Sequence, residues 1–144
     1  MDIKPQYVIV RSFDELQKAF AVRSIVFVEG QNCSYHEEMD SHELSSVHFL
    51  ATIDGEPVAA ARMRPVGDFF KIERLAVRKA WRGRGIGKEM FAFVLASIAE
   101  TGCKKIKLHA QAYLVKFYED FGFVQKGEMF TEANIEHFYM ERVG

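Results

Sequence analysis

The chain has 144 residues, of which 49% are hydrophobic and 27% are charged, a composition typical of one globular domain over residues 1–144 and unlike that of a disordered or collagen-like chain. Its 19 Lys and Arg side chains nearly balance its 20 Asp and Glu side chains. The resulting net charge of −1 argues against a protein that binds nucleic acid through excess positive charge, so we expect no nucleic-acid partner.

The first half of the chain predicts one strand, one helix and then three strands. Aromatic and β-branched residues make 7–10 a strand, and Ser12 and Glu15 match a capping box that begins a helix with apolar positions as far as Phe27. The polar stretch 29–46 predicts a surface loop or a short helix. Turns at Asp54-Gly55 and Gly67-Asp68 then separate predicted strands at residues 47–53, 57–66 and 69–77.

The second half of the chain alternates helices with strands. A long amphipathic helix is predicted over residues 85–101, with Gly102 in the left-handed position that ends it. A strand at 105–110 and a short helix at 114–121 follow, and closing strands are predicted at 123–129 and 135–143. This order predicts a mixed α/β sheet.

The strongest chemical signal is a glycine-rich turn at residues 82–88, Arg-Gly-Arg-Gly-Ile-Gly-Lys, between a predicted strand and a predicted helix. Unpaired amides and the helix dipole make such a turn an anion site, which favours a pyrophosphate ligand. The spacing disfavours an ATP-hydrolysing P-loop and does not fit the Gly-x-Gly-x-x-Gly dinucleotide pattern. Two alternatives stay open: a connection that only turns the chain, and a nucleic-acid contact through the basic residues near Trp81.

Two motifs resemble the GNAT superfamily of N-acetyltransferases. Arg82, Gly85 and Gly87 fit the spacing of that family's acetyl-CoA loop, and the preceding stretch 72–77 looks like its fourth strand. Further on, residues 111–123 resemble a late motif in which a helix carrying tyrosine precedes Gly-Phe, although Gln111 stands where the family has Asn. Residues 22–32 and 130–140 also resemble a small bacterial subgroup whose members mostly have no assigned substrate.

The resemblance implies a single α/β domain with a mixed, mostly antiparallel twisted sheet of about six to seven strands, flanked by about four helices and splayed between the fourth and fifth strands. It implies acetyl-CoA as co-substrate and direct transfer of the acetyl group to a primary amine of a small molecule or peptide. A module that binds acyl-CoA without turnover is the alternative. The implied cofactor contacts are Leu75, Ala76, Val77, Arg82, Gly83, Arg84, Gly85, Ile86, Gly87, Lys88, Gln111 and Phe117.

The implied reaction needs a group that protonates the leaving thiolate. Tyrosine, with a pKa of about 10, is protonated at neutral pH, and the resemblance places Tyr118 at the family's general acid position. A tyrosine that only packs in the core is the alternative.

The amine must also lose a proton, and Glu73 is the first choice of base. Alternation along a strand predicts that Lys71, Glu73, Leu75 and Val77 share one face, and a carboxylate on an apolar strand is either paired or open to a cleft. An ion pair with Arg62 or Arg64 is the alternative reading, and His109 and His137 are reserve bases.

The acceptor site is predicted only loosely. The resemblance places Arg23, Glu29 and Gln31 near the acceptor, and we add His137 to these contacts, while local pairing of the same side chains stays open. The acidic residues between 37 and 43 either attract a cationic amine or form a solvated face. Domains of this family often pair, so a homodimer is also left open.

No metal, membrane or export signal is predicted. Cys33, His36, Asp40 and His42 offer metal-type ligands within one loop but lack the second spaced pair of a zinc finger. The longest apolar stretch, 90–99, is too short to cross a bilayer, and the first residues contain no apolar signal core. Two cysteines form no disulfide framework, so we expect a reduced, cytoplasmic protein.

Overall fold

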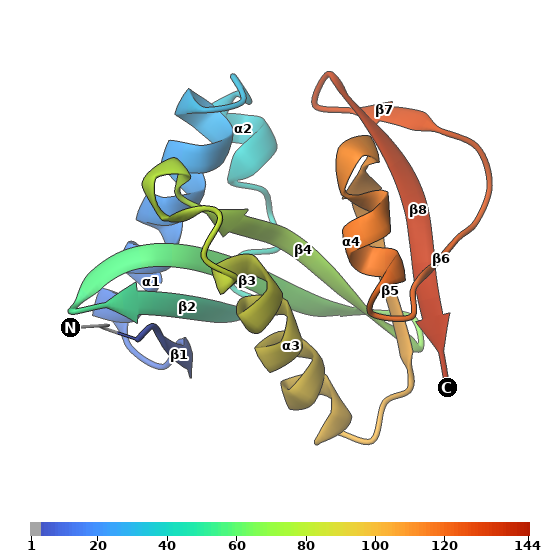
Figure 1. The fold of residues 1–144 in the computed structure, drawn as a ribbon, viewed down its shortest axis with the longest axis horizontal. Helices are drawn as coiled ribbons and strands as arrows, with labels where there is room; N and C mark the ends of the chain where they lie inside the picture. Colours follow the sequence, from blue (N-terminus) through green and yellow to red (C-terminus); the bar gives the residue numbers. More distant parts are fainter. Residues whose placement is uncertain (1–3) are drawn as a thin grey trace.

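The computed structural model describes residues 4–144 except the side chain of His36, and in this part of the chain eight strands form one sheet (Figure 1). The sheet order is β1-β2-β3-β4-β5-β8-β6, with β7 paired to β8. Only β4 and β5 run parallel, and every other pair is antiparallel. The strands are β1 (Gln6–Ile9), β2 (Val47–Ile53), β3 (Glu56–Val66), β4 (Phe69–Val77), β5 (Lys105–Gln111), β6 (Val124–Gln125), β7 (Phe130–Glu132) and β8 (Ile135–Val143).

Four α-helices flank the sheet in the described residues. They are α1 (Phe13–Arg23), α2 (Tyr35–Glu38), α3 (Ile86–Ala99) and α4 (Val115–Glu119), and α1 continues into a π-helical segment, η1 (Ser24–Glu29). The Ser12 hydroxyl accepts the Glu15 amide at 3.1 Å, which confirms Ser12 as the N-cap, while the Glu15 side chain accepts the amide of Arg11 at 2.7 Å instead of that of Ser12. None of these helices is long and apolar enough to cross a membrane.

The two faces of the sheet bury different sets of side chains. Residues of α1 pack with Leu50, Ala60 and Ala76 on one face, whereas α3 and α4 pack on the other face. On the α3 face the fully buried Phe91 contacts four aromatic rings that belong to α4 and the residues after it: Phe117, Tyr118, Phe121 and Phe123. This aromatic packing fixes the position of α4 against α3.

A β-bulge in β4 reverses the predicted alternation of its side chains. Arg62 lies opposite Glu73 and Ala60 lies opposite Ala76, so two residues of β4 face one residue of β3. Arg74 occupies the bulge with a φ of 59°. The prediction that Glu73 shares a face with Leu75 and Val77 is therefore wrong, because the extra residue turns Glu73 to the side that carries Ala76.

The sheet splays between β4 and β5, as the resemblance implied. The two strands pair only from Phe70–Ile72 to Ile106–Leu108 and then separate. Beyond that point, the edge of β4 that faces β5 has no strand partner over residues 73–77. In Figure 1, β4 runs away from β5 and α4 toward the segment that enters α3.

The C-terminal strands differ from their prediction in one place. The strand expected over 123–129 is reduced to the two residues of β6, because Gly127 with a φ of 83° turns the chain out of the sheet. Residues 130–132 form β7, which no sequence signal predicted. Its turn to β8 consists of Ala133 and Asn134, both at positive φ, and lacks the glycine by which such turns are recognised.

Candidate active site

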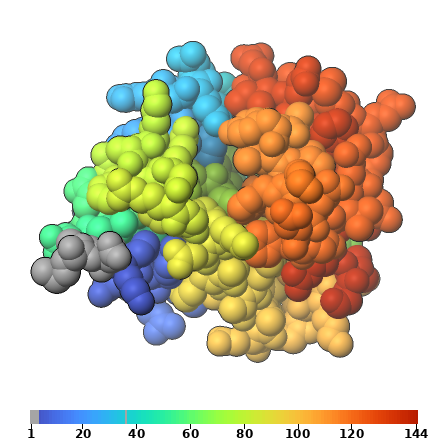
Figure 2. Space-filling view, viewed as in Figure 1, coloured from blue at the N-terminus to red at the C-terminus, as the bar shows by residue number. Residues whose placement is uncertain are grey.

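A cavity of about 360 Å³, called the α3 cavity below, lies between the start of α3, the end of β4 and the residues that lead into α4. The surface is hollowed between the loop before α3 and the α4 region (Figure 2). Arg84 is the one predicted cofactor contact that does not line this cavity, and its guanidinium lies 5.1 Å from the centre of the Trp81 ring. The other eleven do: Leu75, Ala76, Val77, Arg82, Gly83, Gly85, Ile86, Gly87, Lys88, Gln111 and Phe117.

The glycine-rich turn presents a row of free backbone amides to the α3 cavity. Gly83 and Gly85 have φ values of 81° and 80°, which glycine adopts without strain. The first backbone bond of α3 joins the Glu89 amide to the Gly85 carbonyl, and within the described chain the amides of residues 83–88 donate no hydrogen bond to the protein. Arg82 Nε holds the turn to the end of β4 through the Val77 carbonyl at 2.8 Å. Unpaired amides at the N-terminus of a helix are suited to binding an anion.

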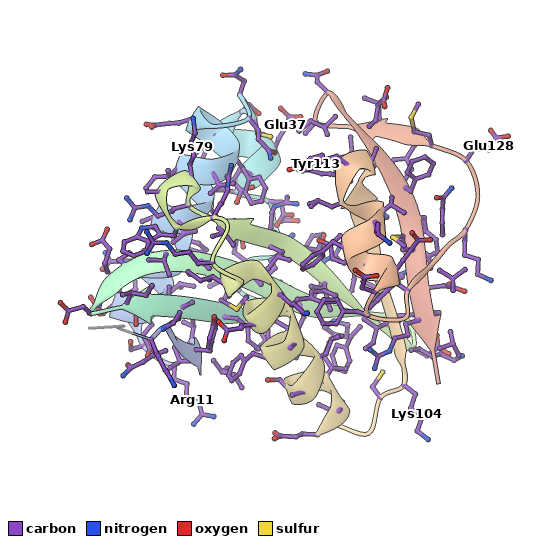
Figure 3. The ribbon with its side chains drawn as sticks, in the orientation of Figure 1. Arg11, Glu37, Lys79, Lys104, Tyr113 and Glu128 are labelled. Atoms are coloured by element: carbon purple, nitrogen blue, oxygen red, sulfur yellow. The ribbon has the colours of Figure 1, made fainter. Side chains whose placement is uncertain are left out.

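A second cavity of about 160 Å³, called the β7 cavity below, lies next to the first. It is bordered by α2, the bulge of β4, β5, α4 and the β7–β8 hairpin. Glu37 on α2 and Tyr113 before α4, both labelled in Figure 3, lie at the same end of the molecule, above the opening of the sheet. Both cavities are bordered by Phe27, Gln31, Leu75, Gln111 and Leu114.

The two cavities meet where the sheet splays. There the side-chain amides of Gln31 and Gln111 bond reciprocally across the gap, with N···O distances of 3.1 and 3.4 Å. The two cavities are therefore adjacent at the opening between β4 and β5.

Tyr118 lines the β7 cavity and is only 7% exposed. Burial raises the pKa of its hydroxyl well above the ordinary value. Among the described residues, this hydroxyl has no hydrogen-bond partner, while the ring packs on Phe91 with 5.1 Å between centroids. Tyr118 therefore presents a protonated hydroxyl that is free to donate.

Glu73 also lines the β7 cavity, and three cations hold its carboxylate. Arg64 Nε lies 2.6 Å from it, and Arg62 Nη2 and Lys71 Nζ each lie at 3.2 Å. Burial by itself would raise the pKa of this carboxyl, but the Arg64 hydrogen bond and the nearby charges outweigh burial and lower the pKa to about 2. The structure thus shows the predicted alternative, with both arginines as partners, and leaves Glu73 a weak base.

Two of the four predicted acceptor contacts reach a cavity. Gln31 and His137 line the β7 cavity. Arg23 is fully buried instead, with Nε 2.6 Å from Glu38 and Nη2 2.7 Å from Glu43. Glu29 is exposed at the end of η1 and lines neither cavity.

Arg23 belongs to a buried ion cluster that also contains Arg62, Glu38, Asp40 and Glu43. Arg23 and Arg62 are both fully buried, and between them they bind all three carboxylates. Because these carboxylates come from α2 and the loop after it, the ion cluster fixes that segment on the sheet. The predicted acidic face is thus largely a set of partners for buried arginines.

Sequence reasoning missed Glu132, which stands between two histidines of the β7 cavity. His109 Nδ1 lies 3.3 Å from one of its oxygens, and His137 Nε2 lies 3.8 Å from the other. The hydrogen bond from His109 lowers the pKa of the Glu132 carboxyl. The only sequence signal for Glu132 was its place in the stretch 130–140, which resembles the bacterial subgroup.

Neither cysteine forms a disulfide, with Cys33 buried and Cys103 partly buried. Across the side chains that the structure describes, no three His, Cys, Asp or Glu residues gather as metal ligands. The side chain of His36, one of the metal-type ligands noted in the sequence, lies outside the described residues.

Comparisons of the sequence and of the structure with known proteins point to the same family. The acetyltransferase (GNAT) domain matches residues 17–143. The uncharacterised N-acetyltransferase YjcF of Bacillus subtilis is 36% identical over 135 residues, which cover 92% of this chain and 96% of YjcF. The crystal structure of Escherichia coli ElaA is 32% identical, with a TM-score of 0.87 and coverage of 97% of this chain and 99% of ElaA.

An acyl-CoA N-acyltransferase structure from Pseudomonas aeruginosa is 27% identical and superimposes with a TM-score of 0.88 over 99% of this chain and 100% of its own. The fold, the splayed sheet and these matches define the class of protein. The chain belongs to the GNAT acetyltransferase family.

Proposed function

We propose that this chain is an acetyl-CoA-dependent N-acetyltransferase that moves the acetyl group directly to a primary amine within a ternary complex. The row of unpartnered amides at residues 83–88 carries this proposal, because it faces the α3 cavity, which shares a wall with the β7 cavity that Tyr118 lines. The family supports it, as does the similar Pseudomonas aeruginosa protein, which is named an acyl-CoA N-acyltransferase.

The α3 cavity has the chemistry that coenzyme A requires. The amides of the glycine-rich turn bind the diphosphate, and Arg82 and Lys88 add positive charge beside it. The unpaired edge of β4 at residues 75–77 binds the amide-containing pantetheine arm, which enters between β4 and β5. Gln111 and Phe117 border the same path.

The chemistry then takes place where the two cavities meet. A backbone amide of the splayed β4 segment stabilises the oxyanion that forms when the amine attacks the thioester, an interaction worth about 10²–10³ in rate in other enzymes. Tyr118 donates its proton to the sulfur as the C–S bond breaks. Its hydroxyl is suited to this role because no described protein group competes for it.

Glu73 has a different role in this proposal from that expected of a base. Transfer of a proton from an ammonium with a pKa of about 10 to a carboxylate with a pKa of about 2 is uphill by roughly 11 kcal/mol. We assign Glu73 the task of holding Arg62, Arg64 and Lys71 in place along the β7 cavity.

Calorimetry with acetyl-CoA tests whether the chain binds this co-substrate, and absence of binding at millimolar acetyl-CoA would remove the proposal. Release of free thiol from acetyl-CoA tests acetyl transfer, with spermidine, lysine, kanamycin or a peptide with a free N-terminus as the acceptor. Binding without thiol release on any primary amine would instead support a module that binds acyl-CoA without turnover.

A further inference from the structure

Acetyl transfer needs a base, and the carboxylates of the β7 cavity are poorly suited to it. Glu73 is held by three cations, and Glu38 is bound by Arg23 and Arg74. Glu37 accepts the Ser34 amide in the capping box of α2. Glu132, the fourth carboxylate of the cavity, accepts the hydrogen bond of His109 Nδ1. Each of these carboxylates therefore already has a partner, which leaves the two histidines of the cavity as candidates.

The hydrogen bonds of His137 fix which of its ring nitrogens is basic. Nδ1 lies 2.7 Å from the Ile135 carbonyl, and since a carbonyl oxygen only accepts, Nδ1 carries the hydrogen. The neutral ring therefore has its lone pair on Nε2. Nε2 is 3.8 Å from Glu132, which is too long for a hydrogen bond and agrees with an unprotonated nitrogen.

The register of β8 places His137 next to the junction of the two cavities. His137 lies directly opposite Gln111, which borders both of them. His109 lies opposite Tyr139, two residues farther from the junction, and its Nδ1 donates to the Glu132 carboxylate. His137 is thus better placed than His109 to meet an amine that attacks a thioester between β4 and β5.

One carboxylate lies within 4 Å of His137 Nε2, where it can stabilise a proton that the acceptor supplies. Glu132 is the lining carboxylate nearest to Nε2, and neither Arg nor Lys forms an ion pair with it in the described residues. The other charged or titratable groups that line this cavity are Glu37 and Glu38 from α2, Lys71, Glu73 and Arg74 from β4, His109 from β5 and Tyr118 from α4.

We propose that His137 Nε2 is the base that takes the proton from the acceptor amine, and that Glu132, oriented by His109, stabilises the imidazolium. This inference rests on the proposed function. The ammonium gives one proton to Nε2, and the nitrogen lone pair so released forms the C–N bond. As the C–S bond breaks, the sulfur takes the proton of Tyr118. The second amine proton replaces it through solvent, and His137 releases its own proton to water.

The decisive variant is His137→Asn. Its amide nitrogen replaces the Nδ1 donor to Ile135, whereas nothing replaces Nε2. With the amine of highest turnover among the four tested above, we expect kcat to fall about 100-fold. The dissociation constant of acetyl-CoA should stay unchanged, and the remaining rate should rise steadily with pH. His109→Asn is the matched control and should lose much less activity.

Two further measurements distinguish a catalytic role of His137 from a purely structural one. Long-range ¹H–¹⁵N correlation spectra, assigned with the variants, should show the Nδ1–H tautomer for His137 in the wild type. Glu132→Gln should move the acid limb of the pH–rate profile to lower pH, because an amide stabilises an imidazolium less than a carboxylate does.

An Nε2–H tautomer, an unchanged kcat in His137→Asn, or a larger loss in His109→Asn would overturn the assignment of His137 while leaving acetyl transfer intact. Failure of the wild type to bind acetyl-CoA, or to turn over any amine, would overturn the proposed function and this assignment together.

Discussion

The α3 cavity and the β7 cavity share a wall, yet beyond that wall they offer different chemical groups to a ligand. The α3 cavity presents the unpaired backbone amides of one contiguous turn, residues 83–88. The β7 cavity presents charged side chains from α2, β4, β5 and the β7–β8 hairpin, which only the fold brings together.

The groups that the two cavities present are therefore held in place by different interactions. The amides of the α3 cavity depend on local backbone conformation at a few glycines, whereas the charged side chains of the β7 cavity depend on ion pairs between distant residues. A substitution that disrupts one should therefore leave the other largely intact, and each prediction below tests that separation.

The largest effect on stability is expected from Arg62→Met. Arg62 is fully buried and pairs with Asp40, Glu43 and Glu73. Its loss leaves three carboxylates without their shared cation, which should lower the free energy of unfolding by about 3–5 kcal/mol. Urea denaturation measures this difference.

Arg78→Met is the control for that variant, because Arg78 pairs with Glu56, whose side chain is 54% exposed. We expect a loss of about 0–1 kcal/mol there. Equal losses in the two variants would show that the ion cluster contributes no more than a surface pair.

Tyr118→Phe should lower kcat about 100-fold, equivalent to roughly 2.7 kcal/mol, because the thiolate then loses its proton donor. Acetyl-CoA affinity should be unchanged, since Tyr118 does not line the α3 cavity. Tyr113→Phe removes the hydroxyl of a tyrosine that is 73% exposed and borders the α3 cavity instead, and it should lower kcat much less. Undiminished turnover in Tyr118→Phe would mean that water protonates the thiolate.

The features predicted from sequence are those whose signals lie close together in the chain. Three strands have the predicted bounds, Val47–Ile53, Phe69–Val77 and Ile135–Val143, because turns flank them and β-branched or aromatic residues fill them. The glycine-rich turn was predictable for the same reason. Its amides, its glycines and the helix that orients them lie within one short segment.

The features that sequence could not predict depend on contacts between distant residues. Nothing local marks Arg74 as a bulge, since its left-handed φ is stabilised by contacts with Glu37, Glu38 and Asp40. Arg23 has many carboxylates within reach of a flexible chain, so only the fold selects Glu38 and Glu43.

Gly85→Val should weaken acetyl-CoA binding by about 2 kcal/mol, or roughly 30-fold, because a side chain at a φ of 80° strains the turn and misdirects its amides. Gly127→Val is the matched control, with a φ of 83° and open space around it, outside both cavities. Calorimetry should show reduced affinity only for Gly85→Val. Similar losses of acetyl-CoA affinity in both variants would show that general strain in the fold causes the effect.

The smallest effect concerns His48, which is buried beside the ion cluster. Burial and the charges of Arg23 and Arg62 lower the pKa of its imidazole, although the hydrogen bond to the Glu43 carbonyl at 2.7 Å opposes this shift. The unfolded chain therefore binds this proton at a higher pH than the folded chain does. Stability should be full above a pH of about 6.5 and should fall below it, by at most roughly 1.4 kcal/mol per pH unit.

His48→Gln separates this contribution from that of the carboxylates. The glutamine amide replaces the donor to Glu43 and does not titrate, so the variant should lose less stability than the wild type between neutral and mildly acidic pH. Glu73, whose pKa is lowered to about 2, acts in a lower window, since its stabilisation is lost only as the pH falls below about 4.5. If the urea midpoints of the wild type and of His48→Gln fall equally between neutral and mildly acidic pH, His48 takes up its proton in the folded state. The ion cluster would then tolerate the added charge.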